Sequence, residues 1–208
     1  HSDSSKPFIV EDALKVSLQK WFVVDGSVRG NSHISQNIPC QDNGCYVPLT
    51  NGWGVAVVCD GAGSAKNSDM GSKYATQVIS KLFADLIEKE DWALSQQLPN
   101  QDEWEHIARE ELKMGLSGLN QYALDKELEL NSLACTVIVV IHAPFGLLVT
   151  HIGDGRAGFC NENGEWCSAI TPHKGEEANQ TVFLTSYQWI KNETLLMSGV
   201  NVPESRVI

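Results

Sequence analysis

One acidic residue, Asp60, directly follows the continuous apolar run 55–59 and is itself followed by Gly61 and Gly63. A carboxylate at the end of a buried strand is costly unless an opposite charge compensates it. A divalent cation supplies that charge, and a glycine lets its own backbone carbonyl approach the same ion. The pattern is consistent with a metal site at Asp60, but an Asp-Gly turn that leaves a strand is also a common structural feature.

The spacing of Gly61 and Gly63 raises a second hypothesis, a loop that cradles phosphate. The Walker spacing is absent, and so is the third glycine of the dinucleotide-binding fingerprint. An acid that opens the loop would also repel a bare phosphate. The phosphate-loop hypothesis is therefore the weaker one.

Two further acids have similar surroundings. Asp42 follows a turn-like Pro-Cys-Gln sequence, and Asp154 lies between two glycines directly after the apolar run 147–152. These acids could converge with Asp60 at one end of a sheet. Oxygen ligands without Cys or His favour Mg²⁺ or Mn²⁺ over zinc.

The elements that would position these acids follow from hydrophobic periodicity. Apolar residues at three- and four-residue steps predict a helix with Ser68 or Asp69 as its N-cap, and a second helix after Pro99 with Asp102 and Glu105 as its capping box. Apolar and β-branched runs predict strands at 21–24, 53–59, 133–141, 147–152, 156–160, 165–170, 181–185 and 194–197, with a loop over 30–44.

Strand 53–59 is almost continuously apolar, which predicts burial of both its faces. Tight turns join several later strands, and strands joined in this way are antiparallel. Two consecutive long helices argue against an alternating doubly wound fold. The pattern favours an α+β fold, an antiparallel sandwich with helices packed on its outer faces.

Composition narrows the class of protein. The chain has 208 residues, 42% of them hydrophobic, and a formal net charge of −11, which fits one domain with a full core and argues against nucleic acid as a partner. The apolar runs are too short to cross a membrane. Six cysteines without a Cys-x-x-Cys pair indicate reduced thiols rather than a disulfide framework or a zinc site. We expect a cytoplasmic monomer.

Short motifs stand in order along the chain: Ser32-His33-Ile34 and Pro39-Cys40-Gln41-Asp42, Asp60-Gly61-Ala62-Gly63-Ser64, Ala134-Cys135-Thr136 and Ile152-Gly153-Asp154-Gly155, then Gly175-Glu176, Ala178-Asn179-Gln180-Thr181 and Phe183-Leu184-Thr185. In this order they resemble the metal-dependent protein phosphatases, the type 2C or PPM family, and most of all its small bacterial branch. The resemblance runs from about residue 21 to the end of the sequence.

The resemblance implies two stacked antiparallel sheets flanked by helices, an α-β-β-α sandwich. It implies a centre of two Mg²⁺ or Mn²⁺ ions that Asp60 bridges, with the Gly61 carbonyl on one ion and Asp42 holding metal-bound water. Asp154 would match the acid of a third, looser metal. The implied reaction is direct hydrolysis of phosphoserine or phosphothreonine in phosphoprotein substrates by metal-activated water.

Three positions depart from the family pattern. Gln41 stands where members often have Glu, Asn37 where many have an Arg that holds substrate phosphate, and Ala62 where better-studied relatives have a His that protonates the leaving group. Arg29 is the candidate replacement for the phosphate ligand, and His33 is the candidate acid. These departures also suggest the alternative of a catalytically weak or inactive phosphatase-like module that binds a partner.

The domain boundaries are expected as follows. Residues 1–20 form an N-terminal extension, partly of cloning origin, and residues 21–208 form the phosphatase domain. The family needs a further Asp after a buried strand near the C-terminus, and no Asp follows Asp154. Val207 and Ile208 resemble the opening of that strand, so the sequence predicts a domain truncated at its C-terminus; the alternative is that the corresponding metal site has been lost.

Overall fold

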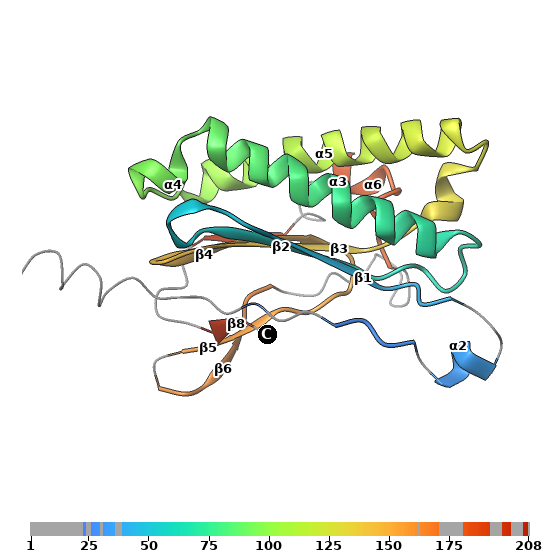
Figure 1. Cartoon of the computed structure of the whole chain (residues 1–208), viewed down its shortest axis with the longest axis horizontal. Helices are drawn as coiled ribbons and strands as arrows, with labels where there is room; N and C mark the ends of the chain where they lie inside the picture. The colour runs from blue at the N-terminus through green and yellow to red at the C-terminus, as the bar shows by residue number, and fades with distance from the viewer. Residues whose placement is uncertain are drawn as a thin grey trace, which may run out of the picture.

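The structure is a computed structural model of the chain (Figure 1). It describes residues 23, 26–29, 31–35, 39–161, 163–170, 181–191, 197–200 and 206–207. For residues 32, 33, 197–200 and 206–207 it describes the backbone alone. The predicted strand at 21–24 and the first three residues of that at 194–197 lie outside the described residues, except for Val23.

A five-stranded antiparallel sheet forms the centre of the molecule. It consists of β1 (Asn43–Pro48), β2 (Gly54–Cys59), β3 (Val137–Ala143), β4 (Gly146–Ile152) and β7 (Met197–Val200), in the order β1-β2-β3-β4-β7. The β3–β4 hairpin turns at Pro144 and Phe145, and Val140 pairs with Val149 in its middle. The predicted hairpin at 133–152 is confirmed.

A second antiparallel sheet has three short strands. It consists of β5 (Gly158–Cys160), β6 (Trp166–Ser168) and β8 (Arg206–Val207), in the order β6-β5-β8. It lies on the side of the large sheet opposite the long helices (Figure 1). A small apolar cluster there joins Val149 of the large sheet to Ala157 and Ile170.

Two long helices cover the other face of the large sheet: α3 (Ser68–Lys89) and α5 (Gln101–Asp125). The main core lies between these helices and the sheet, and its fully buried large side chains include Trp53, Phe83, Trp104, Leu112 and Leu119. The shorter helices are α2 (Asn31–Ser35), η1 (Thr50–Gly52), α4 (Trp92–Ser95), η2 (Leu130–Leu133) and α6 (Gln188–Lys191). The predicted α+β class, with two antiparallel sheets and packed helices, is confirmed.

The N-caps of both long helices lie one or two residues before the predicted N-caps. The N-cap of α3 is Asn67 rather than Ser68 or Asp69. The capping box of α5 is formed by Asn100 and Glu103, where the side chain of each accepts a hydrogen bond from the backbone of the other. The predicted Asp102–Glu105 box is wrong because the same three-residue spacing occurs in two registers.

The prediction that strand 53–59 is buried on both faces is wrong. Val55 and Val57 point toward the helices and are fully buried, whereas Val58, on the opposite face, is 51% exposed. The described part of the second sheet is short and covers the large sheet around Val149, not at Val58. The almost continuous apolar run of strand 53–59 therefore did not reveal that Val58 is exposed.

Two other segments also differ from their predicted structure. The expected loop 30–44 contains α2 and the first residues of β1. Residues 181–185 form no strand, but Val182 and Leu184 are buried, and Leu184 N–H donates to the Cys135 carbonyl at 2.8 Å. No helix among the described residues is long and apolar enough to cross a bilayer.

One buried histidine makes the stability of the sheet depend on pH. His142 in β3 is 5% exposed, and its ring stacks on Tyr46 with Nε2 2.9 Å from the tyrosine hydroxyl. Burial lowers the pKa of His142 to about 4. The unfolded chain, with a pKa near 6.5 for histidine, therefore binds a proton at a higher pH than the native state does.

It follows that the stability contributed by neutral His142 is present above about pH 6.5 and is lost as the pH falls toward 4. We expect wild type to lose about 3 kcal/mol of unfolding free energy over this interval that His142→Gln does not lose. Urea unfolding at several pH values measures the difference. The exposed His106→Gln is the control, and equal slopes for wild type and His142→Gln would contradict the prediction.

Candidate metal centre

Asp60 leaves the end of β2 with its backbone fixed to β3. Its N–H donates to Thr136 Oγ1 at 3.2 Å, and its carbonyl accepts from Thr136 N–H at 2.8 Å. Thr136 is 4% exposed, so this pair of bonds is shielded from water. Thr136 therefore serves the fold by bonding to the backbone at the end of the neighbouring strand.

Gly61 follows the end of β2 and bonds to the residues that precede β1. Its N–H donates to the Gln41 carbonyl at 3.1 Å, whereas its neighbours bond to the other side, where Ala62 N–H donates to the Ala134 carbonyl at 2.9 Å. Among the described residues none donates a hydrogen bond to the Gly61 carbonyl. Buried backbone carbonyls are rarely left without a partner, so this oxygen is suited to a ligand that the protein itself does not supply.

Asp42 is brought to the same place by the residue before it. Gln41 is 8% exposed; its amide Nε2 donates to Ser68 Oγ at 2.8 Å, and its carbonyl accepts from Ser72 Oγ at 2.6 Å. These bonds tie the start of β1 to the first turn of α3. Asp42 then stands at the edge of the sheet, with its carbonyl 2.9 Å from Ser27 Oγ.

The carboxyl groups influence one another. Although solvent reaches Asp60, its pKa is raised to about 6, mainly by desolvation by the surrounding protein and then by Asp42, as a hydrogen-bond partner and as a like charge. Asp154 contributes a weaker repulsion of the same sign. The three predicted acids, which lie far apart in the sequence, therefore meet at one end of the sheet, where they concentrate negative charge.

Asp154 sits on a loop that packs against Thr136. Gly153, with a φ of 114°, has no room for a side chain, since a Cβ would lie 2.6 Å from Thr136 Cγ2. The carboxylate of Asp154 accepts a hydrogen bond from Thr181 Oγ1 at 3.2 Å. Thr136 thus contacts both acid-bearing loops, through its hydroxyl on one side and its methyl group on the other.

Oxygen atoms alone make up the candidate ligand set for a divalent cation. No three His, Cys, Asp or Glu side chains within the described ranges lie close enough together to hold one ion. Mg²⁺ is usually bound by only one or two carboxylates and keeps several waters, and an oxygen-only set suits Mg²⁺ and Mn²⁺ alike. Asp60 and Asp42 with the Gly61 carbonyl provide such a set, and their mutual repulsion is what a cation would relieve.

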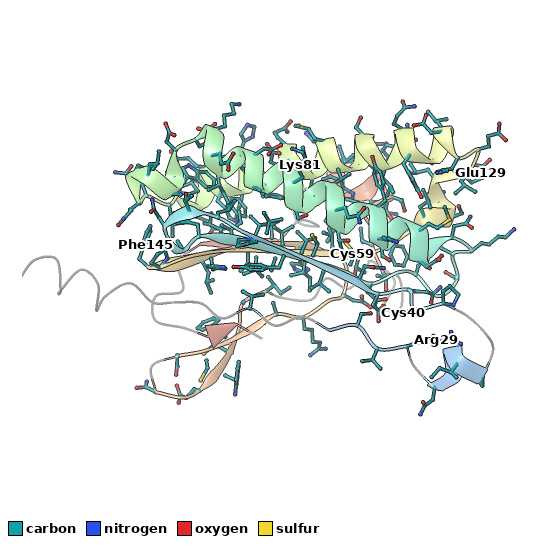
Figure 2. The ribbon with its side chains drawn as sticks, viewed as in Figure 1. Arg29, Cys40, Cys59, Lys81, Glu129 and Phe145 are labelled. Atoms are coloured by element: carbon teal, nitrogen blue, oxygen red, sulfur yellow. The ribbon has the colours of Figure 1, made fainter. Side chains whose placement is uncertain are left out.

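The candidate phosphate ligand, Arg29, and the candidate acid, His33, lie on the N-terminal segment. Arg29 Nη2 donates to the Ile34 carbonyl of α2 at 3.4 Å, and Figure 2 shows Arg29 near Cys40, two residues before Asp42 in the sequence. His33 lies within α2, where the structure describes its backbone alone. Their roles stay predictions.

The sequence missed the residues that support the acids. Ser68 and Ser72 hold Gln41 across 27 and 31 residues of sequence, and Thr181 holds Asp154 across 27. Serine and threonine are common everywhere, so their types carried no signal. Only the position of Thr181 in a family motif could have singled it out.

The chain is similar to proteins of known family. The family model for protein phosphatase 2C matches residues 29–202. Serine/threonine-protein phosphatase 3 of Escherichia coli strain K12 is 30% identical over 190 residues, which cover 86% of this chain and 69% of that protein.

Solved structures share the fold. A Stage II sporulation E family protein from Thermanaerovibrio acidaminovorans aligns with a TM-score of 0.55 at 13% identity, over 79% of this chain and 78% of that one. Serine/threonine phosphatase Stp1 from Staphylococcus aureus aligns with a TM-score of 0.50 at 16% identity, over 80% of this chain and 64% of its own length. The chain thus spans less than two thirds of some of its relatives. Because the family model matches most of the sequence, from residue 29 to residue 202, the chain belongs to the protein phosphatase 2C family.

Proposed function

We propose that the protein is a metal-dependent phosphatase that hydrolyses phosphoserine and phosphothreonine in proteins. The observation that carries the proposal is the convergence of Asp42, Asp60 and Asp154, where desolvation, and after it the two neighbouring acids, raise the pKa of Asp60 to about 6. Membership of the protein phosphatase 2C family supports the same activity.

Asp60 and Asp42, with the Gly61 carbonyl, are the proposed ligands of Mg²⁺ or Mn²⁺. When bound, such ions supply Lewis-acid activation of the attacking water and neutralise charge that develops on the phosphoryl group. We propose two ions here and a third, weaker site at Asp154. The backbone bonds of Asp60 to Thr136 and the anchoring of Gln41 to Ser68 keep the ligands in position before an ion arrives.

Arg29 is the proposed ligand of the substrate phosphate, and His33 the proposed proton donor to the leaving group. Ser27, two residues before Arg29, donates its hydroxyl to the Asp42 carbonyl at 2.9 Å. The segment that carries both residues therefore starts in contact with the acid cluster. A guanidinium there would offset the negative charge that otherwise repels a phosphorylated substrate.

The second candidate function is that of a weak or inactive relative that binds a partner. One observation favours it. The amide of Gln41, at a position where the family often has a glutamate, is buried and bonded to Ser68. A neutral side chain committed to α3 in this way reduces the number of anionic ligands.

The deciding experiment is hydrolysis of p-nitrophenyl phosphate and of matched phosphoserine, phosphothreonine and phosphotyrosine peptides, with millimolar MnCl₂ or with EDTA. We expect Mn²⁺-dependent release of phosphate, with the serine and threonine peptides preferred. Absence of turnover together with tight Mn²⁺ binding in calorimetry would instead support the partner-binding alternative.

Thr181 offers a finer test of the role of Asp154. Thr181→Val keeps the shape of the side chain but removes the hydroxyl that donates to Asp154 Oδ2 at 3.2 Å. We expect turnover to fall about threefold to tenfold with little change in Tm, because the lost bond is exposed. Thr181→Ser should restore turnover. A fall in Tm that matches the fall in activity, without rescue by serine, would contradict a positioning role.

A further inference from the structure

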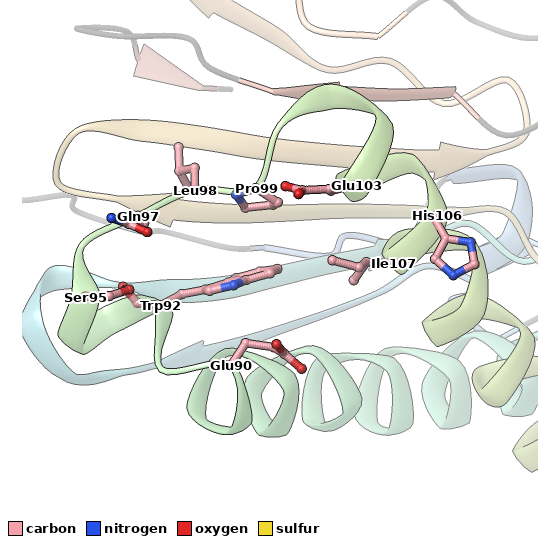
Figure 3. Close-up of a pocket in the computed structure, with 9 residues that line it drawn as sticks. All are labelled: Glu90, Trp92, Ser95, Gln97, Leu98, Pro99, Glu103, His106 and Ile107. Atoms are coloured by element: carbon pink, nitrogen blue, oxygen red, sulfur yellow. The ribbon is translucent and has the colours of Figure 1, made fainter.

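The two ends of α3 border different parts of the molecule. The C-terminal end borders a cavity of about 470 Å³, whose lining includes Glu90, Trp92 and Ile107 (Figure 3). None of the residues that line this cavity is one of the three candidate acids. The N-terminal turns of α3 instead hold the residues that lead into β1, where Asp42 lies. The contact between α3 and β1 is therefore the one that bears on the geometry of the acids.

Buried hydroxyl groups recur at every fourth residue along one side of α3. Ser68, Ser72, Thr76 and Ser80 are at most 2% exposed. Thr76 and Ser80 donate to carbonyls of their own helix, at residues 73 and 77. A hydroxyl that bonds back to its own helix in this way is a common arrangement. Ser72 differs in the partners that it has outside the helix.

The hydroxyl of Ser72 bonds to the residues on both sides of Asp42. It donates to the Gln41 carbonyl at 2.6 Å, and it accepts a hydrogen bond from Asn43 Nδ2 at 3.1 Å. The Asp69 carbonyl, an alternative acceptor within α3, lies farther away at 3.2 Å. The carbonyl of Gln41 belongs to the peptide group that precedes Asp42. One hydroxyl therefore holds the backbone before Asp42 and the side chain after it.

The register of the two strands sets Asp42 opposite Asp60. The pairing of β1 with β2 joins Asn43 to Cys59, so the next residues outward, Asp42 and Asp60, face each other across the strands. Successive side chains of a strand lie on opposite faces of the sheet. Cys59 is fully buried in the core beneath the helices, so the side chain of Asp60 lies on the other face. The same register brings the carboxylate of Asp42 to that face.

The sequence of β1 specifies this register only weakly. β1 lies at the edge of the five-stranded sheet, contains Gly44 and Pro48, and has no regular alternation of buried and exposed residues. A slip by one residue would turn Asp42 to the opposite face. Two like charges directly opposite each other also disfavour the observed register when no cation is present. A bond from outside the strand that holds the register would therefore favour metal binding.

We propose that Ser72 is a positioning residue of the metal centre, whose hydroxyl fixes the strand register that sets Asp42 opposite Asp60. The inference rests on the proposed function, because it assigns these two acids to one metal centre. Ser72 acts through Asp42 and contacts neither the ion nor the substrate. Its bonds exist before an ion arrives, so they reduce the cost of bringing the two carboxylates together.

The test compares Ser72→Ala with Ser80→Ala, a matched control on the same helix. Ser80 is similarly buried, and its Oγ lies 3.1 Å from the Gln77 carbonyl and 3.2 Å from Cys45 Sγ, so its loss also removes contacts within α3 and to β1. We expect both variants to lower Tm by about 2–5 °C. Only Ser72→Ala should weaken Mn²⁺ binding, by about tenfold in calorimetry. Equal losses of affinity, or no loss in Ser72→Ala, would overturn the proposal.

Asn43→Ala tests the same bridge from the strand and keeps the question open to experiment if Ser72→Ala does not fold. It removes the donor to Ser72 but leaves the bond from Ser72 to the Gln41 carbonyl. We expect Mn²⁺ binding about threefold weaker than in the wild type. Adding Asn43→Ala to Ser72→Ala should cost less than about twofold more, because one hydroxyl takes part in both bonds. Additive losses, or wild-type affinity in Asn43→Ala, would contradict the bridge.

A measurement without metal separates this inference from the proposed function. In EDTA, hydrogen exchange of the Gly61 amide reports its bond to the Gln41 carbonyl, which is also the acceptor for Ser72. Exchange at Gly61 should be about threefold to tenfold faster in Ser72→Ala than in Ser80→Ala. Equal exchange rates would show that Ser72 does not hold the strand. A wild type that binds no Mn²⁺ would instead overturn the proposed function, and with it any role of Ser72 at a metal, whatever the exchange rates.

Discussion

Asp60→Asn is expected to reduce Mn²⁺-dependent hydrolysis of p-nitrophenyl phosphate to background and to abolish the rise in Tm that Mn²⁺ gives the wild type. Asparagine keeps the shape of the side chain and the backbone bonds to Thr136, but it removes the charge that the cation requires. An ion at a hundredfold excess over its Kd stabilises the native state by about 2.7 kcal/mol. For a chain of 208 residues this corresponds to about 5–10 °C in Tm.

In the metal-free protein, Asp60→Asn should have the opposite effect: it should not lower the stability. Burial and the neighbouring acids raise the pKa of Asp60 to about 6, so the native state binds a proton more tightly than the unfolded chain does. The cost of ionising Asp60 therefore grows as the pH rises from about 4 to 6 and is complete above that range. In EDTA at pH 7, Asp60→Asn should be at least as stable as the wild type.

Asp85→Asn is the control for both measurements. Asp85 is an exposed acid of α3 that pairs with Lys81 at 2.6 Å, far in sequence from the acid cluster. Its replacement should leave activity and the Mn²⁺-induced shift in Tm unchanged. A Mn²⁺-induced shift of wild-type size in Asp60→Asn would remove Asp60 from the metal site.

The fold was predictable where periodicity was strong and the elements were long. Periodicity predicted α3 and α5 correctly from their apolar positions, and β3 and β4 correctly from their β-branched runs. β1 was missed because Asn43, Gly44 and Pro48 are typical of loops, and its strand character comes from pairing with β2. α4 was missed because it has only four residues and stands between two positive φ angles, at Asp91 and Gln96, without a glycine at either.

The convergence of the three acids was predictable because Asp60 and Asp154 follow apolar strands and all three acids belong to short motifs. Their supports were not, since a hydrogen bond such as that of Gln41 to Ser68 links elements whose spatial relation the sequence does not state.

Gly61→Ala tests whether the backbone around the acids must be as close as the structure has it. A Cβ on Gly61 would lie 2.7 Å from the Gln41 carbonyl oxygen and 2.9 Å from that of Ser68. Both atoms are backbone, so relief requires that the start of β1 or of α3 moves. That movement would displace Asp42 and the Gly61 carbonyl together, which are two of the three proposed ligands.

We therefore expect Gly61→Ala to lower the free energy of unfolding by about 1–3 kcal/mol and to weaken Mn²⁺ binding, measured by urea unfolding and by calorimetry. Gly63→Ala is the matched control, because a Cβ there meets no atom within 4 Å and the chain is only two residues further on. A Gly61→Ala variant with the Mn²⁺ affinity of the wild type would show that the contact between Gly61 and Gln41 does not position the ligands. The same affinity loss in both variants would point to the flexibility of the loop, rather than to close backbone approach, as the property that the glycines supply.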